Sequence, residues 1–180
     1  MSFERLWTPW RLAYVTEASR TVPACIFCAA VAGPDPDPLV VHRGERTFVI
    51  LNKFPYNNGH VMVVPYRHVP RLSDLDAADL AELMALAQAV ERALTDLYRP
   101  HGFNLGINVG KPAGAGVLNH LHLHVVPRWD GDTSFMTVFG DTRVLPEELG
   151  VTAGRVREAL ARVLAAPPAS ASSVSSEPGR

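Results

Sequence analysis

The sequence contains few cysteines, almost no net charge and no long apolar run. Only two of its 180 residues are cysteine, which is too few for a secreted scaffold held together by disulfides. The 17 basic and 18 acidic residues give a net charge of −1, so no overall field attracts the chain to nucleic acid or to an anionic membrane. Any anionic ligand must therefore be held by a local site.

Apolar runs such as residues 61–65 are far too short to span a bilayer, and the first 15 residues contain no apolar signal core. We therefore expect a cytoplasmic protein with no membrane partner. The length and the 47% hydrophobic content suit one compact core. We expect a single domain over residues 1–164, with an aromatic N-terminal arm at residues 6–15. The tail at residues 165–180, rich in Ala, Pro and Ser, should be disordered.

Apolar segments bounded by turn residues predict five strands, at residues 39–42, 47–51, 60–65, 103–109 and 120–127. The first three follow one another closely, which predicts an antiparallel meander. Apolar residues recur at helical spacing from Leu80 to Leu97, after a pair, Ser73 and Asp76, that resembles a capping box. A further short helix is predicted at residues 152–164.

Three histidines alternate with apolar residues in the last predicted strand: His120, His122 and His124. Successive side chains of a strand point to opposite faces, so the three imidazoles should share one face while leucines anchor the other. Neighbours on one face lie roughly 7 Å apart, so the rings should line a site and not pair with one another. A half-solvated strand that merely carries histidines is the alternative, but three titratable rings without an acidic partner would be an odd surface.

The histidine strand follows a glycine-rich turn that contains Gly110, Gly114 and Gly116. Backbone N–H groups of such a turn, beside imidazoles, suit a phosphate, although glycines in turns also serve simply to allow positive φ. An imidazole is a competent nucleophile toward phosphorus when its other nitrogen is hydrogen-bonded to an acceptor that fixes the tautomer. The central ring, His122, is the candidate. No Asp or Glu lies beside it, so we expect a backbone carbonyl of a neighbouring strand to orient it.

Cys25 and Cys28 have the C-x₂-C spacing of zinc ligands. A redox dithiol is the main rival, but it normally lies at a helix start near a βαβ unit, and no βαβ pattern is present. There is no second cysteine pair, so the two remaining zinc ligands must be histidines. Spacing alone does not choose His68 and His120 over the other candidates, which are His42, His60 and His101.

Residues 120–126 match the His-x-His-x-His pattern, with each x apolar, of the histidine triad (HIT) superfamily, and Pro127-Arg128 continues it. Residues 48–52 and 59–65 resemble the nucleoside-binding strands of that family. The Cys-x-x-Cys and Pro-x-x-His elements resemble its zinc-containing branch, so the resemblance covers about residues 6–149. It implies an α+β fold with an antiparallel sheet of about five strands, one long helix and one or two short helices. It also implies a homodimer whose two sheets join side by side.

The resemblance implies a role for each site residue. His122 would be the nucleophile that takes a nucleoside monophosphate from the α-phosphate of the substrate. Asn52 would hold the ribose and Asn108 would face the phosphates. The remaining substrate contacts would come from His60, His124 and the turn residue Gly116, and a structural zinc would be held by Cys25, Cys28, His68 and His120.

One departure concerns the leaving group. Many members carry a Ser or Thr hydroxyl shortly before the triad, where this sequence has Gly114-Ala115-Gly116-Val117-Leu118-Asn119 and no hydroxyl. Asn119 or backbone N–H groups are the candidates for that task. Residues 129–136 resemble a bacterial subgroup close to diadenosine tetraphosphate phosphorylases, in which this segment reaches toward the site of the dimer partner.

The resemblance predicts an enzyme that binds an adenine nucleotide or a dinucleoside polyphosphate and cleaves it by hydrolysis or phosphorolysis through a nucleotidyl-histidine intermediate. The residues do not choose between water and phosphate as the acceptor. Two other functions stay open. One is a metal-dependent hydrolase that uses the three histidines as ligands, and the other is a nucleotide-binding regulatory module with little turnover.

Overall fold

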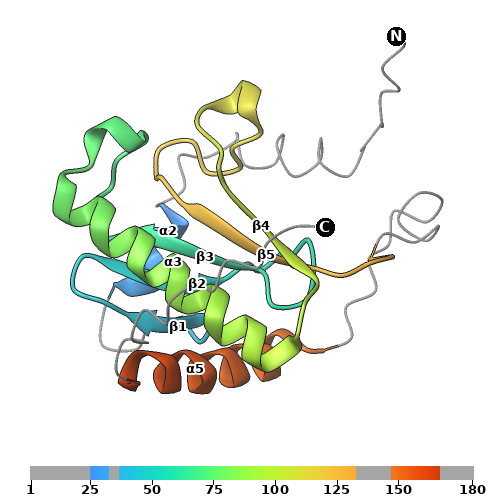
Figure 1. Ribbon diagram of the computed structural model, residues 1–180. Helices are drawn as coiled ribbons and strands as arrows, with labels where there is room; N and C mark the ends of the chain where they lie inside the picture. The colour runs from blue at the N-terminus through green and yellow to red at the C-terminus, as the bar shows by residue number, and fades with distance from the viewer. Residues whose placement is uncertain (1–24, 33–36, 133–146, 167–180) are drawn as a thin grey trace, which may run out of the picture.

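A computed structural model describes residues 25–32, 37–132 and 147–166 (Figure 1). The predicted N-terminal arm and the tail beyond residue 166 lie outside these residues. The described helices are α2 (Ile26–Val31), α3 (Ala77–Tyr98) and α5 (Leu149–Ala165), with the short 3₁₀ turns η1 (Leu72–Asp74) and η2 (Lys111–Ala113). The strands are β1 (Val40–Arg43), β2 (Thr47–Leu51), β3 (Val61–Pro65), β4 (Gly102–Ile107) and β5 (Leu123–Arg128).

All five strands form one antiparallel sheet in the order β1-β2-β3-β5-β4. The predicted meander of the first three strands is confirmed. The last strand in sequence, β5, lies between β3 and β4, so β4 forms one edge of the sheet. With one long helix, α3, beside the sheet, the predicted α+β class and strand number are confirmed.

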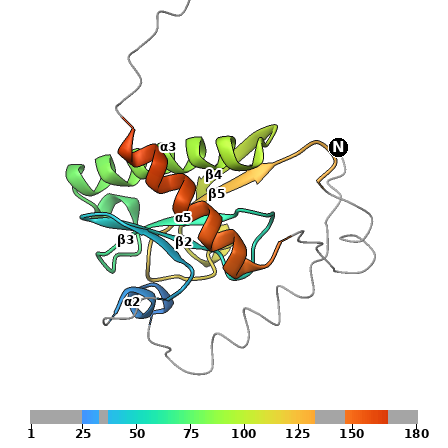
Figure 2. The same cartoon turned by 90° about the horizontal axis from the view of Figure 1, so that it is seen from below.

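The two faces of the sheet bury different sets of side chains. In β2, Val49 and Leu51 pack toward α3 and α5, whereas Phe48 and Ile50 pack toward α2. Every residue of β2 and β3 is buried, which explains why almost all residues of these strands are apolar. Figure 2 shows α3 and α5 together on one side of the sheet and α2 on the other.

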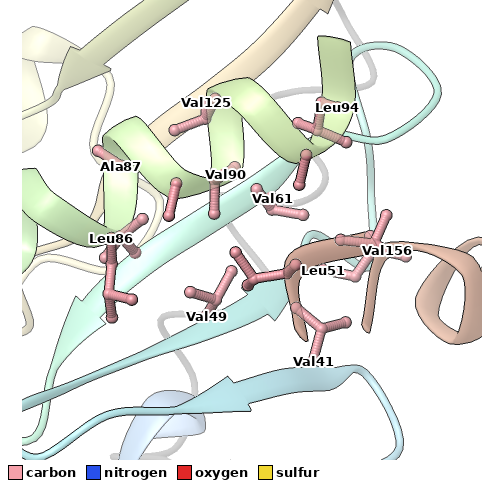
Figure 3. Packing of buried hydrophobic residues seen from close by; sticks show 14 of the residues in the cluster. Val41, Val49, Leu51, Val61, Leu86, Ala87, Val90, Leu94, Val125 and Val156 are labelled. Carbon is pink, nitrogen blue, oxygen red and sulfur yellow. The ribbon is translucent and has the colours of Figure 1, made fainter. Parts of the chain in front are cut away.

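The larger cluster of buried residues lies between the sheet and the pair of long helices (Figure 3). Val90 and Leu94 of α3 meet Val61 of β3 there, and Val156 comes from α5. The regular recurrence of apolar residues along α3 is what supplies this face. Among the described residues, no helix combines the length and apolarity that a membrane crossing requires.

The long helix begins three residues later than the predicted capping box. Its N-cap is Asp76, whose Oδ1 accepts hydrogen bonds from the backbone N–H groups of Ala78 and Asp79, both at 2.9 Å. Ser73 belongs instead to η1, so its predicted capping role is wrong. At the other end the helix stops at Arg99, which has a left-handed φ of 48°.

The predicted boundaries also change for the last strand and the last helix. The strand predicted at residues 120–127 is regular only from Leu123, so His120 and His122 precede β5. The reason is a contact with a segment distant in the sequence: the N–H of Leu121 donates to the carbonyl of Val69 at 2.7 Å, outside the strand ladder. Helix α5 runs over Leu149–Ala165 and is longer than the predicted segment 152–164.

The turn between β2 and β3 requires its glycine. Gly59 has φ of 75°, a conformation that side chains with a Cβ rarely adopt. A Cβ placed there would also come within 3.1 Å of a ring carbon of Tyr98 in α3. The turn therefore packs closely against the helix, and this contact fixes the position of the next residue, His60.

Candidate functional site

Four side chains from three parts of the chain meet next to α2, on the side of the sheet that α2 covers. Cys25 caps α2 and Cys28 lies within it, and their spacing of three residues places both thiols on one side of the turn. The Sγ atom of Cys25 lies 3.2 Å from Nδ1 of His120, and Sγ of Cys28 lies 3.3 Å from Nδ1 of His68. All four candidate ligand atoms lie within 4.8 Å of one another, so this group could hold a metal ion.

The donor set and the tautomer of His120 both fit zinc. His120 is almost fully buried, and its Nε2 lies 2.8 Å from the carbonyl oxygen of Pro65. The Nε2–H group therefore donates to this carbonyl, and the lone pair of Nδ1 faces the thiols. Two thiolates and two imidazoles around a tetrahedral zinc would place neighbouring ligand atoms about 3.4–3.8 Å apart, close to the separations above.

His122 is held by a backbone carbonyl, as expected, but by one in its own segment. Its Nδ1 lies 2.9 Å from the carbonyl oxygen of His120, and not beside a carbonyl of a neighbouring strand, because the backbone bends before β5 begins. Nδ1–H donates in this contact, so Nε2 carries the lone pair. The ring is 4% exposed, and burial lowers the pKa of His122. A neutral imidazole with a lone pair on Nε2 is the form that acts as a nucleophile.

Hydrogen bonds also fix the tautomers of His60 and His124, which contact each other. The backbone N–H of Tyr56 donates to Nδ1 of His60 at 3.0 Å, which places the proton of His60 on Nε2. That atom lies 2.9 Å from Nδ1 of His124, so it donates there and the proton of His124 lies on its own Nε2. The ring centroids of His122 and His124 are 4.8 Å apart. The prediction that the triad rings stay roughly 7 Å apart without pairing is therefore wrong.

Asn52 lies in the loop between β2 and β3, and Asn108 and Gly116 lie in the connection between β4 and β5. The Nδ2 atom of Asn52 lies 3.5 Å from Nε2 of His60, and its Oδ1 accepts the backbone N–H of Phe54. Asn108 follows the last residue of β4, which pairs with Leu123 next to His122. Gly116 is exposed and lies after η2. Gly110 and Gly114 have positive φ, so conformational need accounts for these two glycines.

The structure brings further residues to the site that the sequence did not single out. The ring of Tyr56 lies 4.7 Å from that of His60, and the ring of Phe27 lies 5.0 Å from that of His122. Asp132 accepts a hydrogen bond from Nδ2 of Asn57 at 2.7 Å, which ties the turn before His60 to the end of β5. The position of Phe27 between the two cysteines was a possible signal, whereas nothing near Asn57 points to Asp132.

Comparisons with known proteins agree with this arrangement. A model of the HIT domain matches residues 35–131. The chain belongs to the HIT family. A relative named AP-4-A phosphorylase, from Mycobacterium tuberculosis, is 46% identical over 153 residues, which cover 81% of this chain and 78% of the relative.

Solved HIT structures share the fold. A Zn-bound histidine triad family protein from Mycobacterium smegmatis has a TM-score of 0.64 and 34% identity, covering 78% of this chain and 95% of that chain. A hypothetical histidine triad nucleotide-binding protein, ST2152 from Sulfolobus tokodaii, has a TM-score of 0.64 and 28% identity. It covers 77% of this chain and 93% of that chain. The resemblance to the HIT family seen in the histidine motif is thus confirmed.

Proposed function

We propose that this HIT protein is a dinucleoside polyphosphate phosphorylase that transfers a nucleotidyl group through His122. The observation that carries the proposal is the hydrogen bond from Nδ1–H of His122 to the carbonyl of His120, because it leaves the Nε2 lone pair for attack on phosphorus. The 46% identity to a protein named AP-4-A phosphorylase supports this substrate class and phosphate as the acceptor.

The proposed reaction has two displacements at the α-phosphorus. Nε2 of His122 forms a P–N bond while the bond from phosphorus to the bridging oxygen breaks, and the leaving nucleotide takes the electron pair. A phosphate oxygen then attacks the same phosphorus, and the P–N pair returns to His122. Diadenosine tetraphosphate and phosphate would give ATP and ADP. The covalent adduct splits one difficult step into two easier ones.

The neighbouring residues would hold the substrate around this nucleophile. We assign the ribose to Asn52 and the phosphates to Asn108, Gly116 and His124, with His60 fixing the tautomer of His124. Through this tautomer, His124 presents an N–H from Nε2, and such a donor suits a phosphate oxygen. Asn119 or backbone N–H groups of the preceding turn would assist the leaving group in place of the absent hydroxyl.

We also propose that Cys25, Cys28, His68 and His120 bind a structural zinc. The donor chemistry and the Nδ1 tautomer of His120 support it, as does the Zn-bound structure of a 34% identical relative. Zinc would supply a cross-link between α2, the segment after β3 and the segment before β5. The three-histidine metal site is less well supported, since within the described residues the one group able to hold a metal takes only His120 from the triad.

A homodimer is the proposed assembly, with β4 as the joining edge. β4 has only β5 as a neighbour in the described sheet, and its central residues are exposed, including Leu105 at 45%. An exposed edge strand is a ready template for pairing with a second strand. The two sheets would then continue across a twofold axis.

The product test separates the candidate activities. Purified protein is incubated with diadenosine tetraphosphate with and without phosphate, and the nucleotides are identified. We expect ADP with ATP only when phosphate is present. AMP with ATP formed without phosphate would favour the second candidate, a hydrolase, which the same nucleophile serves with water as the acceptor.

The intermediate is tested with substrate labelled at the α-phosphate. We expect an alkali-stable, acid-labile protein adduct that is absent from His122→Gly, with turnover in that variant at least about 10³-fold lower. His101→Ala is the control, because His101 is an exposed residue paired with Asp130. Substrate binding without adduct or turnover in the wild type would favour the regulatory module.

A further inference from the structure

Phe27 lies between the metal cluster and the proposed nucleophile. It belongs to α2, two residues after Cys25 and one before Cys28. Its side chain is 1% exposed. The centroid of its ring is 5.4 Å from that of His120 and 5.0 Å from that of His122. One aromatic ring therefore contacts both a candidate metal ligand and the nucleophile.

The other contacts of Phe27 hold its ring in place. It is part of the buried cluster on the α2 face of the sheet, together with Val40, Phe48, Ile50 and Met62. Interiors of this kind are close-packed, and a ring inside them has little freedom to move. The position of Phe27 is thus set by the sheet on one side and by α2, which Cys25 caps and in which Cys28 follows Phe27.

We propose that Phe27 is a positioning residue for His122, which sets the plane of its imidazole and connects the metal-binding turn to the nucleophile. The inference rests on the proposed function of His122. The hydrogen bond from Nδ1 to the carbonyl of His120 restrains rotation about the Cβ–Cγ bond, but a hydrogen bond alone tolerates a range of angles and so leaves the plane of the ring loosely defined. The rings of Phe27 and His124 contact the imidazole at 5.0 Å and 4.8 Å and restrict this rotation.

Attack on phosphorus needs the Nε2 lone pair to be in line with the breaking bond, so orientation affects the rate of the chemical step. Misplacement of a reacting group by about 1 Å costs about 100-fold. The ring of Phe27 therefore couples the position of α2, and of the cysteines at α2, to the orientation of His122. This coupling is separate from the hydrogen bond between His122 and the His120 backbone. The metal-binding turn would then contribute to the rate as well as to stability.

The test compares Phe27→Leu with a matched variant, Val40→Ala. Both side chains are buried in the same cluster, but Val40 lies in β1, outside the segments that resemble the nucleoside-binding strands of the family. The two variants should lose similar stability and keep one zinc per chain. Single-turnover formation of the labelled adduct should fall about 10- to 100-fold in Phe27→Leu and stay within about threefold in Val40→Ala, with KM unchanged in both.

A second readout does not depend on activity. In zinc-loaded protein labelled with ¹⁵N-histidine, the Nδ1–H of His122 should give one sharp ring N–H signal in the wild type and in Val40→Ala. In Phe27→Leu the ring should take several orientations, so this signal should broaden or split. If Phe27→Leu does not fold, Phe27→Met retains more of the volume without the ring, and the same loss of rate and signal is expected.

The outcomes separate this inference from the proposed function. A wild type that forms no adduct would overturn the proposed function, and the ring signal would still decide whether Phe27 positions His122. A wild type that forms the adduct, with Phe27→Leu and Val40→Ala equally fast and both with the sharp ring signal of the wild type, would overturn the inference alone.

Discussion

Replacing Asp132 by asparagine should destabilise the protein, because this carboxylate accepts hydrogen bonds both from the end of β5 and from the turn between β2 and β3. Its oxygens accept hydrogen bonds from Nε and Nη2 of Arg128 at 2.6 and 2.8 Å. They also accept the N–H of Trp129 at 3.2 Å and Nδ2 of Asn57 at 2.7 Å. The carboxylate is 10% exposed. It therefore joins the end of β5 to the turn that leads to His60.

The magnitude follows from what asparagine cannot replace. It has one acceptor oxygen and no charge, and its NH₂ group would face a donor of Arg128 or Asn57. Hydrogen bonds to charged groups contribute about 1.5–3 kcal/mol each, but Arg128 is 44% exposed and water would replace part of the loss. We expect Asp132→Asn to lower the free energy of unfolding by about 2–3 kcal/mol, or the midpoint of thermal unfolding by about 5–10 °C.

The loss of unfolding free energy in Asp132→Asn should depend on pH. The hydrogen bonds from Arg128, followed by those from Trp129 and Asn57, hold the pKa of Asp132 well below its usual range, against the opposing effect of burial. An unfolded aspartate titrates near 3.9, so below about pH 4 the unfolded chain takes up a proton that the folded one does not. The stability contributed by Asp132 is present above this pH and is lost as the pH falls. The gap between wild type and Asp132→Asn should therefore narrow from pH 7 toward pH 2.5.

Urea unfolding monitored by circular dichroism at several pH values measures this gap. Asp130→Asn is the matched control, because Asp130 is two residues away, 94% exposed and paired with exposed His101. It should change the free energy of unfolding by less than about 0.5 kcal/mol. Two results would refute the reasoning. One is equal stability of the two variants, and the other is a difference in unfolding free energy between wild type and Asp132→Asn that stays constant down to pH 2.5.

Three other perturbations test the metal cluster, the core and the sheet edge. Cys25→Ser removes a metal ligand and should lower the free energy of unfolding by about 3–5 kcal/mol along with zinc content. A fully stable but inactive variant would point to a redox or catalytic cysteine instead. Leu94→Ala, at a fully buried position of α3, should cost about 2–4 kcal/mol in urea unfolding, whereas Met84→Ala, at a position 56% exposed on the same helix, should stay within about 0.5 kcal/mol. Leu105→Lys should convert a dimer to a monomer in sedimentation velocity, and a monomeric wild type would contradict pairing through β4.

The fold was predictable where the sequence pattern is local. Residues 47–51 form β2 as predicted, because all five positions are buried and four of them, Phe48 to Leu51, are an unbroken apolar run. The start of β5 was not predictable. Alternation continues through His120 and His122, but contacts with Pro65 and Val69, about fifty residues earlier in the chain, bend the backbone before Leu123.

The candidate site was predictable only in part for the same reason. The cysteine spacing pointed to zinc, but it left five histidines as possible ligands, and only the resemblance to the HIT family selected His68 and His120. The tautomer of His122 depends on a bend in its own segment, and that of His124 on the turn containing Tyr56. Such hydrogen bonds join residues through the folded backbone, so no spacing in the sequence encodes them.

The wide separation of the metal ligands has a consequence for the life of the nascent chain. Cys28 and His120 are 92 residues apart in sequence, and the strand that follows His120 is the last of the five strands along the chain. A ribosome adds about 5–20 residues per second, so the two thiols would wait about 5–20 s before the fourth ligand is even made. During this interval the cysteines are open to oxidation or to capture of a competing metal. Correct metal loading should therefore be sensitive to the speed of translation across residues 29–120 and to the redox state of the cell.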